Sequence, residues 1–341
     1  MIKCSLKKEI MNTIRNRVLA GMRPTGRLHL GNYLGAAKGM LALQDDPDFD
    51  TLFTVVDIHA TTTPYDQKTL KASARDVFID YLSVGLDPEK SAITIQSDLS
   101  DLITQLSFYL SSVMSVARMQ HLPTFKEKVK QHPDNVTMAL LNYPLLMAAD
   151  ILIYKASKVP VGIDQEPHLE IAREVARKMN ERFGTDFPEP TRFATVGEYV
   201  PSLLGGGKMS KSVEGSSIEL DDNLDTIISK LKKAPTDSGR GNKVPVEGGV
   251  ANLLQFVKLF EGEDSRKHYE ILYTSSGIRY GDLKKQLAEA IFAELKPIQE
   301  KRVELEKNPE YIDKMIALGA KKSRAIAEKT VEEVKKKMGL G

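Results

Sequence analysis

The chain contains a single cysteine, Cys4, among its 341 residues, and this scarcity excludes several classes of protein. One cysteine cannot form a disulfide within the chain, and it cannot supply a zinc or iron–sulfur site built from several cysteines. No apolar run reaches the roughly 18 residues that a membrane-spanning helix needs. We therefore expect no structural metal, no iron–sulfur cluster and no membrane partner.

The first 17 residues are charged and lack the continuous apolar core of a secretory signal. We interpret residues 1–17 as an extension and expect a cytoplasmic protein. The formal net charge is only +2, so any nucleic-acid binding would have to come from local clusters of charge. Two common nucleotide-binding fingerprints, the G-x-x-x-x-G-K-[ST] loop and the G-x-G-x-x-G turn, are also missing.

Short apolar runs rich in β-branched residues alternate with helical segments over the first two-thirds of the chain, for example at 51–57, 91–96 and 158–162. Runs without polar alternation are typical of strands covered on both faces. The pattern predicts an α/β fold over residues 18–222, with a Rossmann-like, mostly parallel sheet and a helical insertion. Residues 223–341 have helical periodicity throughout, which predicts an all-helical C-terminal domain.

The stretch from Leu19 to Ala37, LAGMRPTGRLHLGNYLGAA, has the pattern of a strand end, a turn and the start of a helix. In α/β proteins this order presents backbone N–H groups to a phosphate. His29 and Asn32 are two neutral polar side chains one helical turn apart. We expect Gly31, between them, to leave room for a ligand to approach the backbone.

Asp150 interrupts a long apolar run that is predicted to form a helix starting at Pro144. Tyr143, Met147 and Asp150 follow one another at spacings of four and three and so share one face. A buried carboxylate needs donors, because it can only accept hydrogen bonds. The residues alone leave two roles open, a structural partnership with an arginine or a backbone N–H, or recognition of a ligand such as an indole N–H.

Two later segments carry nucleotide-binding chemistry. In VPVGIDQ, residues 159–165, Gly162 permits close backbone approach and Asp164 can accept from ribose hydroxyls, or merely cap the next helix. In GGGKMSKS, Lys208 and Lys211 lie three apart and can close two ammonium groups on one polyphosphate. A lysine in such a loop is more often simply solvated.

Together these segments resemble the signatures of the class I aminoacyl-tRNA synthetases. HLGN resembles the HIGH motif, GIDQ resembles an element shared by tryptophanyl and tyrosyl members, and KMSKS matches the second family signature in every letter. YPLLMAADILIY resembles the segment in which tryptophanyl members use an aspartate, here Asp150, to read the indole nitrogen. The resemblance covers the chain from about Val18 to its end.

The resemblance implies activation of L-tryptophan by ATP to tryptophanyl-adenylate, followed by transfer to tRNA(Trp), in a homodimer. Mg²⁺ would arrive with ATP as part of the substrate. The implied catalytic residues are His29, Asn32, Lys128, Lys208 and Lys211. The implied ATP-binding residues are Arg23, Thr25, His29, Gly31, Asn32, Gly162, Ile163, Asp164, Lys208, Met209, Ser210 and Lys211. The implied amino-acid-binding residues are His59, Tyr143, Met147, Asp150, Val159, Val161 and Gln165.

Selectivity is expected to depend on Asp150. A wrong side chain would leave the carboxylate unpaired, and sites built on such a bond reject analogues by factors on the order of 10⁴–10⁵. Four positions depart from the commonest family pattern. Leu19 and Ala20 stand where phenylalanine and serine are usual, Arg23 stands where glutamine is usual, and Ile163 stands where glutamate is often found. Arg23 adds a fixed charge that can reach a carboxylate or a phosphate.

The helical domain is implied to receive the anticodon end of the tRNA, and Thr236-Asp237-Ser238 resembles a family segment near that surface. Between Lys321 and Lys337 seven cationic residues face three acidic ones, a local excess of four. This excess can contact phosphates or form a solvated helix face, and both interpretations remain open.

Two other functions remain open, a tyrosyl synthetase and a non-catalytic relative that senses amino acids or binds RNA. Tyrosyl members usually differ in the HIGH region, and inactive relatives usually lose part of HIGH or KMSKS. Exchange of pyrophosphate into ATP, measured with each amino acid in turn, separates the three.

Overall fold

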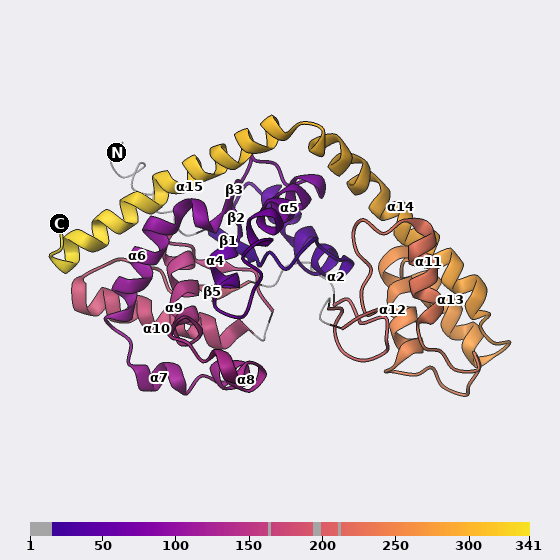
Figure 1. The fold of residues 1–341 in the computed structure, drawn as a ribbon. Coiled ribbons are helices and arrows are strands. Elements are labelled where there is room, and N and C mark those ends of the chain that lie inside the picture. The colour runs from indigo at the N-terminus through magenta and orange to yellow at the C-terminus, as the bar shows by residue number, and fades with distance from the viewer. Residues whose placement is uncertain (1–15, 163–164, 194–198, 211–212) are drawn as a thin grey trace, which may run out of the picture. The chain divides into compact units, whose positions relative to one another are not determined.

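The described residues, 16–162, 165–193, 199–210 and 213–341, contain one five-stranded sheet in this computed structural model (Figure 1). Every strand pair is parallel, and the order is β3-β2-β1-β4-β5. The strands are β1 (Arg17–Met22), β2 (Asp50–Val55), β3 (Ala92–Ile95), β4 (Lys158–Val159) and β5 (Thr191–Arg192). The predicted α/β fold with a Rossmann-like parallel sheet is confirmed.

The strand order reverses beside β1, with β2 and β3 on one side and β4 and β5 on the other. β2 is buried at each position from Thr51 to Val55, so its unbroken apolar run reflects cover on both faces. Open parallel sheets bind ligands outside the carboxyl ends of their strands at such a reversal. The fold therefore favours a ligand site beside the carboxyl ends of β1 and β4.

The chain divides into two compact units, which are described separately. The sheet unit comprises the described residues within 1–26, 40–195 and 308–341, and the helical unit those within 27–39 and 196–307. This division differs from the expected boundary at residue 222 in two ways. The described residues within 27–39 and 196–222 belong to the helical unit, and the last helix belongs to the sheet unit.

Helices account for most of the sheet unit outside the strands. They are α4 (Asp57–Ala60), α5 (Leu70–Ser83), the 3-10 helix η2 (Gln96–Leu99), α6 (Ser100–Ser111), α7 (Val116–Gln120), α8 (Pro123–Gln131), the 3-10 helix η3 (Pro133–Asn135), α9 (Met138–Ile153), α10 (Glu166–Phe183) and α15 (Pro309–Met338). Leu106 of α6, Leu152 of α9 and Val175 of α10 are fully buried in one core. None of the described helices is long and apolar enough to cross a membrane.

The helix that carries Asp150 begins earlier than predicted. The side chain of Thr137 accepts a hydrogen bond from the Leu140 N–H and caps α9, so the helix starts at Met138 rather than at Pro144. Pro144 lies inside the helix, where it lacks an N–H to donate to the preceding turn. The predicted start was wrong because the proline was given more weight than the threonine cap.

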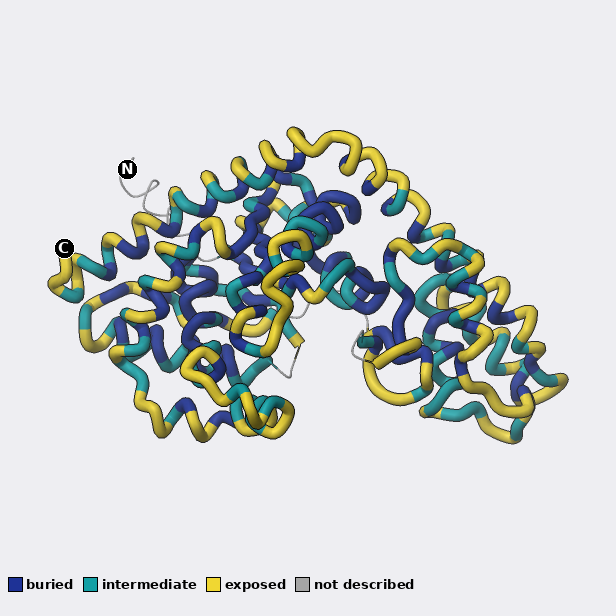
Figure 2. Tube along the Cα trace, viewed as in Figure 1, coloured by how far each residue is buried: buried dark blue, intermediate teal, exposed yellow. Residues whose placement is uncertain are grey.

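α15 runs along the sheet unit as a 30-residue helix with one buried face (Figures 1 and 2). A Cβ atom on Gly319 would lie 1.6 Å from the Ile93 carbonyl oxygen, so glycine lets the helix touch β3 directly. Arg324 donates to both Asp101 carboxylate oxygens at 2.8 Å, and Lys337 donates to the Gly184 carbonyl oxygen at 2.5 Å. Part of the cationic excess of this helix therefore holds it on the sheet unit.

The helical unit contains the other described helices. They are α2 (Leu30–Asn32), the π-helical turn η1 (Tyr33–Ala37), α11 (Leu224–Lys233), α12 (Gly249–Glu261), α13 (Glu263–Thr274) and α14 (Tyr280–Glu306), while α3 (Lys38–Gln44) is shared between the units. The helical character predicted for the C-terminal part of the chain is confirmed.

Candidate active site

A cavity of about 470 Å³ opens within the sheet unit beside the carboxyl ends of β1, β2 and β4. It lies where the reversal of strand order favours a ligand site. All seven residues expected to bind the amino acid line it, namely His59, Tyr143, Met147, Asp150, Val159, Val161 and Gln165. Arg23 and Lys128 line it as well. The structure therefore brings together side chains that are more than 100 residues apart in the sequence.

Asp150 is buried, with 5% of its surface exposed, and has two side-chain partners. The His59 ring nitrogen Nε2 lies 2.8 Å from its Oδ2 atom, and the Gln96 amide nitrogen donates to its Oδ1 atom at 2.7 Å. An ionised carboxylate can only accept, so His59 is the donor. Each oxygen retains lone-pair capacity for one more donor, because a carboxylate has about four acceptor positions.

Gln96 was missed by the sequence analysis. It follows the last residue of β3 and so lies at the same sheet edge as Asp57 and His59, which follow β2. The same signal, a polar side chain directly after a buried strand, could have found it.

A second polar network in the cavity wall surrounds His168, which lies in the first turn of α10. The His168 Nδ1 atom lies 3.0 Å from the Gln165 amide oxygen, so Nδ1 carries the proton. Its Nε2 atom lies 2.7 Å from the Tyr143 hydroxyl and 2.8 Å from the Thr124 hydroxyl. Burial raises the pKa of the Tyr143 hydroxyl, which therefore stays protonated. His168 was also missed, because no motif contains it.

Arg23 and Lys128 place positive charge on the cavity wall. The Arg23 Nη2 atom donates to the Thr63 hydroxyl at 3.0 Å, and the Lys128 Nζ atom donates to the Gln131 amide oxygen at 2.9 Å. The Arg23 Nε atom is buried without a hydrogen-bond partner among the described residues. Burial lowers the pKa of both groups, and the charge of Arg23 lowers the pKa of Lys128 further. This wall is suited to an anion, which would supply the missing acceptor and offset the repulsion.

In the helical unit, His29 and Asn32 form a reciprocal cap on the helix that they begin. The His29 Nδ1 atom accepts from the Gly31 N–H at 3.0 Å, and the Asn32 amide oxygen accepts from the His29 N–H at 3.2 Å. Because Nδ1 accepts, the His29 Nε2 atom carries the ring proton, and the Asn32 NH₂ group is a second donor at this helix start.

Gly31 is closely packed inside the helical unit. A Cβ atom there would lie 2.8 Å from the His29 ring and 3.2 Å from the Met209 side chain. A side chain at this position would collide with the His29 ring and crowd Met209 of the KMSKS loop. Glycine at this position is therefore required for packing within the helical unit.

The remaining predicted ATP-binding residues differ in their exposure. Lys208 is exposed, whereas Met209 is buried and donates its N–H to the Val200 carbonyl oxygen at 3.0 Å. Thr25 is exposed, and its N–H donates to the Arg23 carbonyl oxygen at 2.9 Å. Of the remainder, Gly162 is exposed, Ser210 is half-buried, and Ile163, Asp164 and Lys211 lie outside the described residues.

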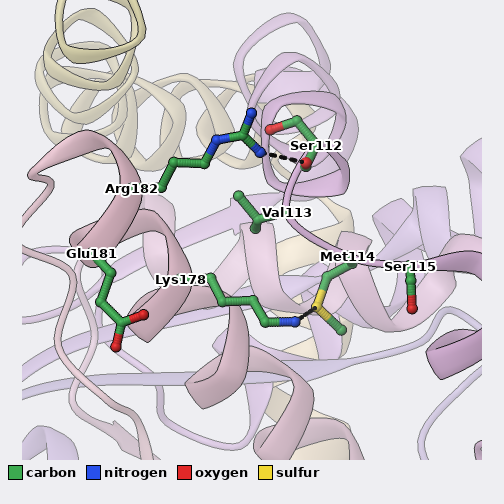
Figure 3. Close-up of a pocket in the computed structure, with 7 residues that line it drawn as sticks. All are labelled: Ser112, Val113, Met114, Ser115, Lys178, Glu181 and Arg182. Atoms are coloured by element: carbon green, nitrogen blue, oxygen red, sulfur yellow. Dashed lines mark hydrogen bonds between the residues drawn. The ribbon is translucent and has the colours of Figure 1, made fainter.

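No group of three or more histidine, cysteine, aspartate or glutamate side chains in the described part of the chain could hold a metal ion. A second depression, of about 530 Å³, lies between the end of α6 and α10 (Figure 3). There Arg182 donates to the Ser112 carbonyl oxygen at 3.4 Å, and the Lys178 ammonium lies 3.8 Å from the Met114 sulfur. None of the predicted site residues lines it.

Residues 11–296 match the sequence model of the family described as "tRNA synthetases class I (W and Y)". The chain belongs to this family. The tryptophan–tRNA ligases of Porphyromonas gingivalis and Helicobacter pylori are each 41% identical to it, over 95% and 96% of this chain and 99% of theirs. These relatives place the chain among the tryptophanyl members, as the resemblance implied, and not among inactive proteins.

Solved structures agree with this placement. The tryptophanyl-tRNA synthetase of Campylobacter jejuni, complexed with ADP and tryptophan, has a TM-score of 0.83 at 33% identity, covering 95% of this chain and all of that one. A tyrosyl-tRNA synthetase from Aeropyrum pernix, at 21% identity and a TM-score of 0.67, is similar in fold alone. The tyrosyl alternative is therefore the weaker one.

Proposed function

We propose that the chain activates L-tryptophan with ATP in this cavity and then transfers the tryptophanyl group to tRNA(Trp). The observation that supports the proposal best is Asp150, a buried carboxylate that faces the cavity and still has acceptor capacity. An indole N–H is a donor and cannot accept, so it complements this carboxylate. Met147, beside Asp150 in the cavity wall, offers a polarizable surface for the ring.

The polar end of the amino acid would meet the other side chains of the wall. Tyr143 and Gln165 present oxygen atoms that can accept from the tryptophan ammonium group. Hydrogen bonds to the His168 ring keep both side chains in position. Arg23 would donate its unpartnered Nε–H to the tryptophan carboxylate or to the α-phosphate of ATP. Val159 and Val161 complete the apolar part of the wall.

In the first reaction a tryptophan carboxylate oxygen attacks the α-phosphorus of ATP, and the bond to pyrophosphate breaks. The protein contributes by positioning the reactants and by stabilising charge, and it forms no covalent bond to the substrate. His29 and Asn32 would donate to phosphate oxygens, and Asp164, with Gly162 beside it, would accept from the ribose hydroxyls. Lys128, Lys208 and Lys211 would offset the charge that develops on pyrophosphate. Mg²⁺ enters with ATP and neutralises part of its phosphate charge.

In the second reaction a ribose hydroxyl of the terminal tRNA adenosine attacks the acyl carbon, and AMP leaves. The helical unit would receive the anticodon end, and the exposed lysines of α15 that have no docking role, such as Lys321, Lys329 and Lys336, would contact phosphates. Reversing these three charges should raise the tRNA KM and weaken its salt dependence without changing adenylate formation. A cytoplasmic homodimer completes the proposal.

The test is ATP–pyrophosphate exchange with each amino acid in turn. Tryptophan alone should support exchange, and stimulation by tyrosine instead would contradict the proposal. Replacing Lys208 and Lys211 together by alanine should reduce exchange by more than 100-fold, because each lysine makes a charge-assisted contact worth about 1.5–3 kcal/mol. Tryptophan binding, measured by equilibrium dialysis, should change little. Lys285→Ala, an exposed lysine of α14, is the matched control.

A further inference from the structure

Gln96 is buried to 1% exposure behind Asp150 and does not itself line the cavity. We infer that Gln96 is the positioning residue that directs the Asp150 carboxylate at the substrate N–H, and that it thereby sets the preference for tryptophan. The inference rests on the proposed function and deepens it, since it assigns part of the substrate selectivity to a side chain that the substrate does not touch.

The orientation of the Gln96 amide is fixed by the backbone. Its oxygen accepts from the Ile58 N–H at 3.0 Å and from the His59 N–H at 3.3 Å. Its nitrogen must therefore face Asp150, to which it donates at 2.7 Å. Turning the amide over would set NH₂ against two N–H groups and an oxygen against a carboxylate. The side chain therefore has one stable orientation, which presents a donor to Asp150.

The same amide also controls the second partner of the carboxylate. The Gln96 oxygen accepts from the backbone N–H of His59, and the ring of the same His59 lies 2.8 Å from Asp150 Oδ2. Gln96 thus acts on Oδ1 directly and on Oδ2 through the backbone of His59. Oδ1 is held by a side chain outside the cavity and Oδ2 by the His59 ring in its wall, and each oxygen keeps one acceptor position for a donor in the cavity.

Gln96→Met keeps a similar volume and removes the donor and the acceptor. We expect the tryptophan KM in exchange to rise by 10-fold or more, with the ATP KM changed less than 3-fold, because a bond to a charged acceptor is lost only at the amino-acid end. The preference for tryptophan over L-3-benzothienylalanine, which has sulfur in place of the indole N–H, should fall several-fold. Gln105→Met on α6, which removes a bond to the Tyr109 hydroxyl, is the matched control and should leave both values unchanged.

Gln96→Glu separates positioning from simple loss of packing. A protonated glutamic acid can donate to Asp150 and accept from the two N–H groups, whereas a glutamate repels Asp150. Other titratable groups also lie near this position. His59 and Tyr154 interact with Asp150, and Asp57, which accepts from the Ser97 N–H at 2.9 Å, interacts with Asp98. The same groups are present in the wild type and in Gln96→Met, so the ratio of variant to wild-type tryptophan KM is compared between Gln96→Glu and Gln96→Met. That ratio should be near one at low pH and rise between about pH 5 and 8, whereas for Gln96→Met it should stay high and flat.

Two failures are distinguishable. Absence of tryptophan-dependent exchange in the wild-type protein would refute the proposed function, whatever Gln96 does. An active wild type with an unchanged tryptophan KM in Gln96→Met, or a pH-independent ratio in Gln96→Glu, would refute the positioning role.

Discussion

Arg23 offers a test in which stability and activity should move in opposite directions. Its Nε–H is buried without a partner, and an unsatisfied buried polar group costs about 1–3 kcal/mol. Its hydrogen bond to the Thr63 hydroxyl contributes only about 0.5–1.5 kcal/mol to stability. Arg23→Gln removes the unpartnered donor and a charge that repels Lys128. We therefore expect the free energy of unfolding to increase by about 1 kcal/mol. For a domain of 150–250 residues this corresponds to a Tm increase of roughly 2–4 °C.

The same substitution should impair adenylate formation. If Arg23 donates to a carboxylate or phosphate of the substrates, its loss removes a charge-assisted bond worth about 1.5–3 kcal/mol. Since about 1.36 kcal/mol corresponds to a factor of ten, kcat/KM for exchange should fall roughly 10- to 150-fold. ATP–pyrophosphate exchange measures the loss of activity, and thermal unfolding measures the change in stability. Pyrophosphate or ATP should also raise the Tm of the wild type more than that of the variant, because the variant has lost a contact to the anion.

Arg118→Gln is the control for this experiment. Arg118 pairs with Glu174 at 2.9 Å in the same unit and does not line the cavity, so its loss should leave exchange unchanged and should not raise the Tm. A lower Tm for Arg23→Gln together with full activity would show that Arg23 is a structural anchor, and the reasoning would be refuted.

Two further predictions concern stability. Gly319→Ala should destabilise the sheet unit by more than about 3 kcal/mol in denaturant unfolding, as overpacking in a closed contact does, because its Cβ would overlap the Ile93 carbonyl oxygen. Gly281→Ala on α14, where nothing lies within 4 Å, should instead be neutral or stabilising by up to about 1 kcal/mol, and equal losses would contradict the docking of α15. At Asp237, burial opposes ionisation, but bonds from the Tyr273 hydroxyl, the Gly239 N–H and the Tyr280 hydroxyl hold the pKa below its usual value. The stability difference between wild type and Asp237→Asn should therefore be full above the ordinary pKa of about 3.9 and shrink as the pH falls below it, and a difference independent of pH would exclude this role.

The sequence was sufficient for features that are carried by local patterns. The buried strand β2 and the alternation of strands with helices could be read from unbroken apolar runs, and the residues around the cavity from short motifs. β5, only two residues long and exposed, has no such pattern and was missed. Its existence depends on pairing with β4, which is a tertiary property.

The docking of α15 could not be predicted for the same reason. Gly319 looks like an ordinary helical glycine in the sequence, and Arg324 looks like one more cation of a basic helix. Only the fold brings them to Ile93 and Asp101, which are more than 200 residues away. Counting the charge of a helix thus overstates what is available to a nucleic acid, because part of it already has partners.

The partners of Asp150 change how selectivity should be explained. The sequence suggested that a wrong ligand leaves this carboxylate unpaired, which would give rejection by factors on the order of 10⁴–10⁵. In the structure His59 and Gln96 already satisfy both oxygens once, so an empty cavity leaves no unpaired charge. An analogue without the N–H then forfeits one bond to a charged acceptor, about 1.5–3 kcal/mol or roughly 10- to 150-fold. The rest of the discrimination has to come from the shape of the cavity and from the rigidity with which Asp150 is held. That rigidity has a second benefit, because a carboxylate that does not have to reorganise keeps the whole of the bond energy for the correct substrate.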